Sequence, residues 1–267
     1  MNPGFKELAS VDGAVTPTAE ATVPMKDDGL YRGDGAFEVI RLYDGKPFAL
    51  VDHLDRLGRS AAAIELELDR AALEREIAAL LAQAGPVNGQ LRLIVTRGGR
   101  RIAATEPIPD HGETLSLATV TYQPTVILNG VKSLSYAANM QASRLARTSG
   151  ADEAVLVRPD GTVLEPPTSA IFWVGADGVL RTPALSDGVL ESITRDRLVR
   201  ALDVAEGTWG VEDLRGASEA FLASTTREIQ AVAAIDDRPL AAAPGPRTEA
   251  AQKAFAETLG RELRELQ

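Results

Sequence analysis

Alternating apolar and polar positions in the first third of the chain predict β-strands. The segment Ala36–Tyr43 (AFEVIRLY) alternates with a period of about two and is rich in β-branched and aromatic residues, which favours a strand. The Asp44-Gly45 dipeptide that follows is a turn signal and predicts a return strand over Pro47–Val51. Two later segments of the same type are expected to be strands, Gln90–Thr96 and Thr114–Tyr122.

Apolar residues at helical spacing predict two helices between these strands. Asp52 can cap a helix that runs through HLDRLGRSAAAI and has one apolar face. A second amphipathic helix is expected over Asp69–Ala84, where a Gly-Pro dipeptide ends it.

The rest of the chain alternates strands and helices. Strands are expected at Val126–Ser135, Glu153–Arg158, Ala170–Val174, Glu219–Ala223 and Ile229–Ile235, and helices at Asn139–Thr148, at Thr194–Leu202 and from Thr248. This order predicts an α+β protein in two parts. We expect a small domain over residues 1–120, a linker over 121–126 around Gln123-Pro124-Thr125, and a larger domain over 127–267.

The composition narrows the classes of function. The formal net charge is −10, which argues against a nucleic-acid surface because such a surface needs a basic footprint. No apolar run approaches the roughly 20 residues needed to cross a membrane. The chain has no cysteine and two histidines, so thiolate chemistry is excluded and no metal centre is expected. The lack of cysteine also fits a cytoplasmic location.

Lys132 differs from the other lysines of the chain. Lys6, Lys26, Lys46 and Lys253 occupy positions typical of solvated surface charges, whereas Lys132 follows the apolar segment TVILNGV. A lysine beside a buried strand can become a nucleophile, because desolvation favours the neutral amine. The spacing alone still favours a surface lysine.

The neighbourhood of Lys132 changes this weighting. The stretch KSLSYAANMQASRLARTSGADEAVLVRPDGTVLEPPTSAIFWV resembles the cofactor segment of the class IV aminotransferases. The resemblance continues upstream in YRGDGAFEVIRLYDGKPFALVDHLDRLGRSAAAI and downstream in LESITRDRLVRAL and EAFLASTTREIQAVAAID. It covers roughly residues 30–240, and the motifs are specific because they occur together and in order.

The resemblance implies pyridoxal 5′-phosphate as the cofactor and roles for three residues around its ring. Lys132 matches the lysine that binds the cofactor covalently and then moves a proton during transamination. Glu165 matches the glutamate that keeps the pyridine nitrogen protonated. Tyr136 matches the tyrosine near the phenolic oxygen. Without the motif, Glu165 would be interpreted as an exposed turn residue and Tyr136 as a packing residue.

The resemblance also implies a phosphate-binding set. Arg56 matches the phosphate arginine, although on its own it would be interpreted as a solvated helix residue. Ile193 and Thr194 match the start of a helix whose free N–H groups suit a phosphate, and Thr225 matches a threonine that reaches the same group. The sequence departs from the family pattern at Glu191-Ser192, Pro166-Pro167 and Ala170, where relatives carry glycine, serine or asparagine.

Positions that contact the substrate carboxylate differ from both main patterns of the family. Phe37 stands where ordinary D-amino-acid enzymes have a tyrosine, and VTRGGRRIAA lacks their histidine. QLRLIV lacks the tyrosine and proline of branched-chain enzymes. Arg32 and Arg92 are the remaining candidates for binding a carboxylate, and they resemble the arginine pair of a variant subgroup of D-amino-acid transaminases.

We therefore expect a D-amino-acid transaminase that uses a 2-oxo acid such as 2-oxoglutarate or pyruvate as acceptor, and that can also accept R-amines. The alternatives are an aminodeoxychorismate lyase, an L-branched-chain aminotransferase and, from another class, a non-catalytic metabolite-binding protein. The resemblance implies a fold type IV architecture, with a small N-terminal α/β domain, a larger C-terminal pseudo-barrel domain and the cofactor at their junction. It also implies a homodimer in which Arg32 can reach the partner's site.

Overall fold

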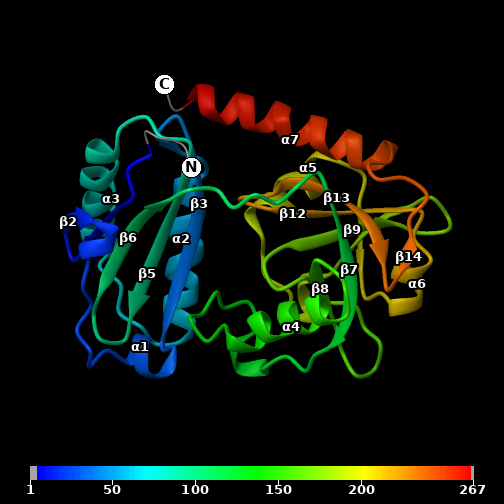
Figure 1. Ribbon diagram of the computed structural model, residues 1–267, viewed down its shortest axis with the longest axis horizontal. Helices are drawn as coiled ribbons and strands as arrows, with labels where there is room; N and C mark the ends of the chain where they lie inside the picture. Colours follow the sequence, from blue (N-terminus) through cyan, green and yellow to red (C-terminus); the bar gives the residue numbers. More distant parts are fainter. Residues whose placement is uncertain (1–4, 266–267) are drawn as a thin grey trace. The chain divides into compact units, whose positions relative to one another are not determined.

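The computed structural model describes residues 5–265, which form two units, each built around its own sheet (Figure 1). The first unit contains the residues up to Pro109, Val131–Tyr136 and the residues from Glu262, and the second contains Asp110–Gly130 and Ala137–Arg261. Residues 1–4 and 266–267, the outer ends of the two expected domains, lie outside the described part.

The first unit contains an antiparallel sheet of six strands in the order β2-β1-β6-β5-β3-β4. The strands are β1 (Leu8–Val11), β2 (Ala14–Pro17), β3 (Gly35–Tyr43), β4 (Lys46–Pro47), β5 (Gly89–Thr96) and β6 (Arg101–Glu106). The helices are α1 (Asp28–Arg32), α2 (Leu50–Ala63) and α3 (Arg70–Ala84).

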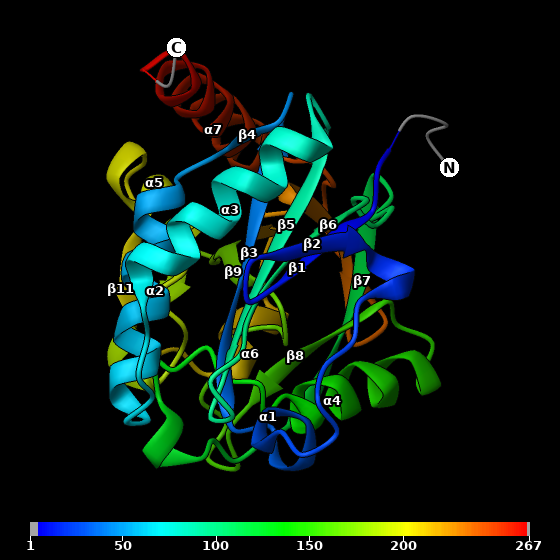
Figure 2. The ribbon, with the colours of Figure 1, turned by 90° about the vertical axis from the view of Figure 1, so that its left-hand side faces the viewer.

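The two faces of this sheet have different roles. Because side chains alternate along a strand, Ala36, Ile40 and Leu42 of β3 face one way and pack with apolar residues of α2 and α3 (Figure 2). The opposite face, which we call the second face, carries Phe37 and Val39 from β3, Gln90, Arg92 and Ile94 from β5, and Ile102, Ala104 and Glu106 from β6. The core of the first unit therefore lies on the helix side, and the second face combines apolar side chains with the polar ones of Gln90, Arg92 and Glu106.

The start of α2 corrects two expectations. The return strand expected over Pro47–Val51 is wrong, since only Lys46–Pro47 pairs with β3 and Leu50 already begins the helix. Asp52 is not its N-cap, because Ala49 occupies that position in the left-handed region, at φ 55°, without a side-chain cap. For α3, the expected limits hold: the Asp69 carboxylate accepts a hydrogen bond from Ala72 N at 2.9 Å and caps the helix.

The second unit is built on a mixed sheet in the order β11-β10-β9-β12-β13-β7-β8, with β14 paired to β13. The strands are β7 (Thr114–Thr121), β8 (Glu153–Val157), β9 (Ala170–Val174), β10 (Leu180–Pro183), β11 (Ala205–Gly207), β12 (Glu219–Ser224), β13 (Glu228–Ile235) and β14 (Arg238–Pro239). The helices are α4 (Ala137–Thr148), α5 (Ile193–Ala201), α6 (Val211–Arg215) and α7 (Pro246–Glu265).

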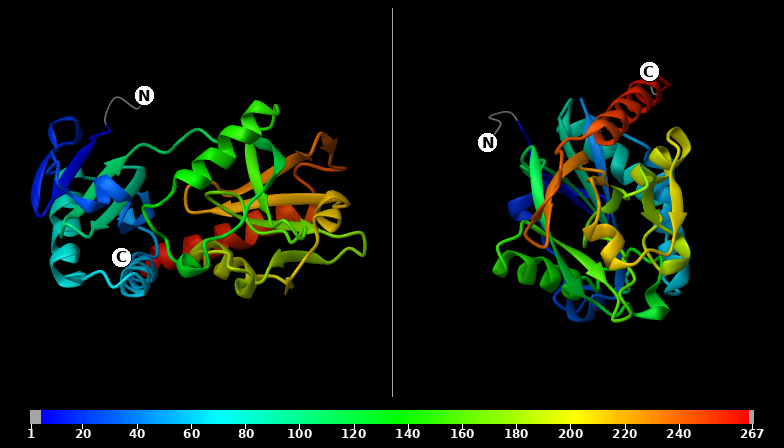
Figure 3. Two further views of the ribbon diagram at one scale, coloured as in Figure 1. Left: turned by 90° about the horizontal axis from the view of Figure 1, so that it is seen from below. Right: turned by 90° about the vertical axis from the view of Figure 1, so that its right-hand side faces the viewer.

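Every residue of β8, β9 and β12 is buried, as the apolar runs in these segments predict. On β9 and β12, Phe172 and Phe221 stack with ring centroids 4.9 Å apart. The α4 helix, green in Figure 3, packs Ala142 and Ala146 against β8. These contacts bury the apolar side chains of the sheet.

Two segments near the junction of the expected domains differ from the prediction. The strand expected at the end of the N-terminal part, β7, instead belongs to the second sheet, where it pairs in parallel with β8 and β13. The strand expected over Val126–Ser135 is wrong: a short 3-10 turn occupies Val126–Leu128, and only Ser133 forms an isolated bridge, to Ala36. Lys132 therefore lies on a connecting segment. The mixed α/β architecture with two sheets is confirmed.

We predict that Leu54→Ala lowers the free energy of unfolding by about 2–5 kcal/mol, because Leu54 is 1% exposed within the core of the first unit. Urea denaturation followed by circular dichroism measures the change. Val51→Ala on the same helix is the matched control, since Val51 is 63% exposed, and its effect should stay within about 0.5 kcal/mol. Equal effects of the two substitutions would contradict this packing.

Candidate active site

The main chain around Lys132 is hydrogen-bonded to the start of β3. Phe37 N–H donates to the Lys132 carbonyl at 3.0 Å, and Leu134 N–H donates to the Gly35 carbonyl at 2.9 Å. On the other side, Lys132 N–H donates to Ser60 Oγ of α2 at 3.1 Å. The backbone of Lys132 is thus fixed by both β3 and α2, although it belongs to no regular strand.

Gly35 allows this close approach. A Cβ at this position would collide with the Val95 carbonyl oxygen and would lie 2.7 Å from Leu134 Cδ1. A larger residue would push the Lys132 segment or β5 away from β3. The glycine of the RGDGAFE motif therefore has a structural role in positioning Lys132.

The amine of Lys132 lies beside two aromatic rings. Its Nζ is 4.5 Å from the centroid of the Phe37 ring, and the Tyr136 ring meets Phe37 edge-on, at 5.3 Å between centroids and an interplanar angle of 84°. Lys132 and Tyr136 are half-buried, and Phe37 is buried. The three residues singled out from sequence around the cofactor ring and substrate are therefore together, with the amine against an aromatic face.

Behind β3, Glu38 joins Arg56 and His53 of α2 in a buried ionic network. The Arg56 Nε and Nη2 donate to the two Glu38 oxygens, both at 2.7 Å, and His53 Nδ1 lies 2.8 Å from Glu38 Oε2. The Glu38 side chain is fully buried and that of Arg56 is 6% exposed. A two-point contact of this kind fixes the plane of the guanidinium.

The network shifts the pKa values of its members. Burial alone would raise the pKa of Glu38, but the Arg56 charge and the hydrogen bonds from Arg56 and His53 outweigh it and lower the pKa to about 2. Burial lowers the pKa of His53 despite its contact with Glu38. Glu38 is thus ionised and His53 neutral at pH 7, which leaves the network without net charge.

Sequence reasoning identified Arg56 but missed Glu38 and His53. A signal was available, because Glu38 is a charged residue on the helix-facing side of an alternating strand, where apolar residues are expected. His53 and Arg56 lie three residues apart, on one side of α2. Buried charge at such a position predicts an opposite charge on the helix that covers it.

Arg92, a candidate for the substrate carboxylate, lies on the second face in a pair with Glu106. Its Nε and Nη2 donate to Glu106 Oε1 and Oε2 at 2.7 and 2.9 Å, and Gln90 Nε2 donates to Glu106 Oε2 at 2.5 Å. The other candidate, Arg32, lies at the end of α1 with its side chain 77% exposed and forms an ion pair with Asp28 at 3.3 Å. Within residues 5–265, Arg32 and Arg92 share no hydrogen-bond or ion-pair partner.

In the second unit, Glu165 lies on a segment that follows β8 and pairs back onto it, since Leu156 N–H donates to the Glu165 carbonyl at 3.1 Å. The Glu165 side chain is half-buried and its Oε1 accepts a hydrogen bond from Leu190 N–H at 2.9 Å. A main-chain donor therefore fixes the orientation of this carboxylate.

The start of α5 and the turn after β12 contain the remaining candidates. Ile193 and Thr194 are buried in the first turn of α5, and Ser192 caps it by accepting from Arg195 N–H. Free N–H groups in such a turn attract anions. Thr225 lies in the tight connection between β12 and β13, which pair antiparallel up to Ser224 and Glu228.

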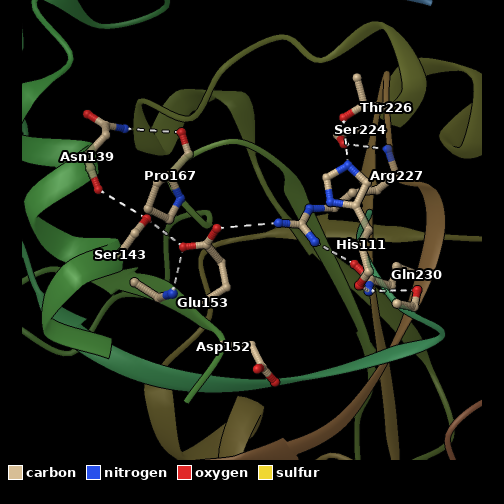
Figure 4. A network of polar contacts seen from close by, with 12 residues as sticks. His111, Asn139, Ser143, Asp152, Glu153, Pro167, Ser224, Thr226, Arg227 and Gln230 are labelled. Carbon is tan, nitrogen blue, oxygen red and sulfur yellow. Dashed lines mark hydrogen bonds and ion pairs between the residues drawn. The ribbon is translucent and has the colours of Figure 1, made fainter. Parts of the chain in front are cut away.

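Residues next to Thr225 belong to a polar network that fixes this turn (Figure 4). His111 Nε2 lies 3.1 Å from Thr226 Oγ1, and Arg227 Nη1 donates to Gln230 Oε1 at 2.5 Å. Arg227 Nη2 also forms an ion pair with Glu153 at 3.5 Å. Burial lowers the pKa of His111 to about 4, so that this imidazole is neutral at pH 7.

The comparison with known proteins places the chain in a family. Residues 35–235 match the model of the amino-transferase class IV family, and the chain therefore belongs to the class IV aminotransferases. The resemblance noted from the motifs is confirmed. Enzymes of this family use pyridoxal 5′-phosphate, which is accordingly the cofactor of this protein.

The relatives of this chain are named after different substrates. A putative branched-chain-amino-acid aminotransferase of Methanocaldococcus jannaschii is 33% identical over 253 residues, which cover 85% of this chain and 88% of the relative. A D-alanine aminotransferase of Bacillus licheniformis is 32% identical, with 91% and 94% covered. A fold IV transaminase from Curtobacterium pusillum superimposes with a TM-score of 0.85 at 28% identity and covers 94% of this chain and 99% of that one. The expected fold is thus confirmed.

Two kinds of feature are absent from the described residues. No helix there is both long and apolar enough to cross a membrane. No group of three or more histidine, cysteine, aspartate or glutamate side chains in residues 5–265 could hold a metal ion.

The residues present suit the cofactor of the family. In the first unit, an amine and a buried guanidinium of fixed orientation suit its aldehyde and its phosphate. In the second unit, the capped start of α5 offers N–H donors of the kind that suit a phosphate. A carboxylate fixed by a main-chain N–H matches its pyridine nitrogen. In addition, Ser169 Oγ, four residues after Glu165, is buried without a hydrogen-bond partner in the described structure.

We predict that the free energy of unfolding falls as the pH drops below about 6.5, because buried His53 and half-buried His111 have lowered pKa values and the unfolded chain binds protons that the native chain does not. Below pH 4.5, protonation of Glu38 adds a further loss, which continues towards pH 2. Urea denaturation at a series of pH values measures both steps.

The two histidine variants separate the contributions. His53→Gln and His111→Gln should each flatten part of the decline between pH 6.5 and pH 4, and the double variant should remove it. A decline that the double variant retains in full would show that other groups cause it.

Proposed function

We propose that the protein is a transaminase that moves an amino group between a D-amino acid and a 2-oxo acid such as 2-oxoglutarate or pyruvate, and that it also accepts R-amines. The observation that supports this most is the arrangement on the second face. The Lys132 amine lies over Phe37, and Arg92, a carboxylate ligand of the right charge, lies on the same face two residues from the register partner of Phe37.

The bound pyridoxal phosphate supplies an aldehyde that takes up the amino group and a ring that withdraws electrons from the substrate Cα. Lys132 Nζ is the group that holds the cofactor and later accepts and returns the proton of the substrate Cα. Its main chain is fixed by β3 and α2, so the amine can move on a flexible side chain from a constant origin. Tyr136 and Phe37 form an aromatic wall beside it.

We assign the phosphate to Arg56, to the N–H groups of Ile193 and Thr194, and to Thr225. Glu38 supports Arg56 by holding its guanidinium in one plane. The α5 start contributes aligned N–H donors and the positive end of a helix dipole. Glu165 is assigned to the pyridine nitrogen, where its charge keeps a proton on that atom while Leu190 N–H keeps the carboxylate oriented.

We assign the substrate carboxylate to Arg92 and to Arg32. Arg92 lies on the same face as the amine, whereas Arg32 is at the surface of its own chain. We propose that Arg32 acts in the partner's site of a homodimer, which its 77% exposed side chain would permit. Phe37 has no hydroxyl group and therefore contributes an apolar surface to the substrate site.

A second candidate function is the transamination of L-branched-chain amino acids. The relative from Methanocaldococcus jannaschii, 33% identical, supports it, and so does the branched-chain aminotransferase of Thermoproteus uzoniensis, which is 30% identical with a TM-score of 0.85. The D-specific proposal rests on Arg32, Arg92 and Phe37, in a chain whose QLRLIV segment lacks the tyrosine and proline of branched-chain enzymes.

We predict that Lys132→Ala lowers the rate of transamination by about 10²–10⁴-fold or more, because the group that holds the cofactor and moves the proton is lost. Pyruvate formation from D-alanine, coupled to a dehydrogenase, measures the rate. Lys253→Ala is the matched control, since Lys253 is exposed on α7 and should leave the rate unchanged. An undiminished rate in Lys132→Ala would contradict the assignment.

The substrate assignment makes a separate prediction. D-alanine and D-glutamate, added singly to the holoenzyme, should each convert the cofactor to its amine form, with loss of the visible absorbance of the lysine-bound cofactor. L-leucine should give a rate at least about tenfold lower, because its Cα hydrogen points away from the base when its carboxylate lies on Arg92. Conversion by L-leucine alone would favour the branched-chain function instead.

A further inference from the structure

The Arg92 side chain already forms an ion pair with a carboxylate of the neighbouring strand β6. Glu106 takes both nitrogens on the side edge of the guanidinium, Nε and Nη2, at 2.7 and 2.9 Å. The exposed fractions of the two side chains are 33% and 28%, so the pair lies in partial contact with solvent and is not a core element. When Arg92 binds a substrate carboxylate on this face, it therefore does so while it is paired with Glu106.

The register of the sheet explains why the two residues meet. Gln90 of β5 lies opposite Glu106 of β6, and Arg92 lies opposite Ala104. All four residues share the second face, because side chains alternate along each strand. Arg92 and Glu106 are diagonal neighbours, for which Cβ separations are about 7–8 Å, within reach of two long side chains. Ala104 between them offers no bulk that would keep them apart.

The same register places Arg92 near the ring that contacts the amine of Lys132. Phe37, whose ring lies 4.5 Å from Lys132 Nζ, pairs with Ile94, and Arg92 is two residues further along β5 on the same face. Phe37 and Arg92 are thus also diagonal neighbours. Because Glu106 occupies the side edge, the end edge of Arg92, formed by Nη1 and Nη2, is the edge left for a substrate carboxylate.

We propose that Glu106 is a specificity-determining residue that weakens the affinity of Arg92 for carboxylates. This rests on the proposed role of Arg92 in substrate binding. Glu106 places a negative charge beside the guanidinium, and an incoming carboxylate therefore meets a pair with no net charge. At the same time Glu106 orients the guanidinium so that Nη1 and the outer side of Nη2 are left to bind a substrate carboxylate.

The charge of Glu106 persists throughout the neutral range. Burial alone would raise its pKa, but the hydrogen bonds and charge of Arg92 lower it below its ordinary value. Repulsion between two carboxylates on one guanidinium is considerable at a partly buried site, because the effective dielectric constant is well below that of water. The site therefore binds carboxylates weakly. It also accommodates an uncharged group, since Arg92 remains paired with Glu106 when no carboxylate is bound.

The test is competitive inhibition of the holoenzyme by propionate, with propionamide as the uncharged probe of the same shape. In Glu106→Gln the inhibition constant of propionate should fall about tenfold, while that of propionamide should change by less than about twofold. Glutamine keeps the shape and one hydrogen bond to Arg92 but removes the charge. An unchanged or higher propionate constant in a folded Glu106→Gln protein would overturn the proposal.

The matched control is Glu76→Gln. Glu76 forms the same kind of pair with Arg101, at 2.8 Å, but from α3 on the helix side of the sheet. It should change neither constant, and a similar fall in this variant would also overturn the proposal, because the effect would then not be local. Urea denaturation of both variants identifies a purely structural role of Glu106, which would lower stability without changing the propionate constant.

Arg92→Leu separates this inference from the proposed function. If Arg92→Leu leaves the inhibition constant of propionate unchanged, Arg92 does not bind carboxylates. The substrate assignment itself then fails. If Arg92→Leu weakens propionate binding at least about tenfold but Glu106→Gln does not strengthen it, the substrate assignment stands and the role of Glu106 is wrong.

Discussion

The short two-point attachment of the Lys132 segment to β3 is the constraint on which the site depends. Two main-chain hydrogen bonds, together with the Ser60 hydroxyl, fix a lysine that no helix or regular strand would otherwise position. Gly35 makes the close approach sterically feasible. A reactive amine on a flexible side chain thus has a fixed origin, and the aromatic pair of Phe37 and Tyr136 lies beside it.

In the first unit, the charges of two arginines are compensated by carboxylates. Two arginines with proposed anion-binding roles each carry a carboxylate partner at two contact points: Arg56 with Glu38 inside the core, and Arg92 with Glu106 on the second face. The buried pair resists separation because either partner alone would be an uncompensated charge in a low dielectric. The half-exposed pair carries a smaller penalty and therefore suits a site where a ligand carboxylate comes and goes.

Strong periodic signals predicted β3, α3, β5 and β9 within one or two residues, because alternation and capping act locally. The failures have physical reasons. Ala49 starts α2 by adopting a left-handed conformation that no propensity favours. The segment Val126–Ser135 is interrupted by a 3-10 turn and by Gly130 in the left-handed region, at φ 74°. The motifs identified Lys132 and Arg56, but Ser60 and Glu106 become visible only through partners 72 and 14 residues away in sequence.

The most direct test of the account is to locate the covalent bond between protein and cofactor. Reduction of the holoenzyme with borohydride, digestion and mass spectrometry identify the lysine that carries the phosphopyridoxyl group. The account predicts this group on the peptide that contains Lys132 and on no other. A group found on Lys46 or another lysine, or its absence from the Lys132 peptide of an active preparation, would contradict the assignment.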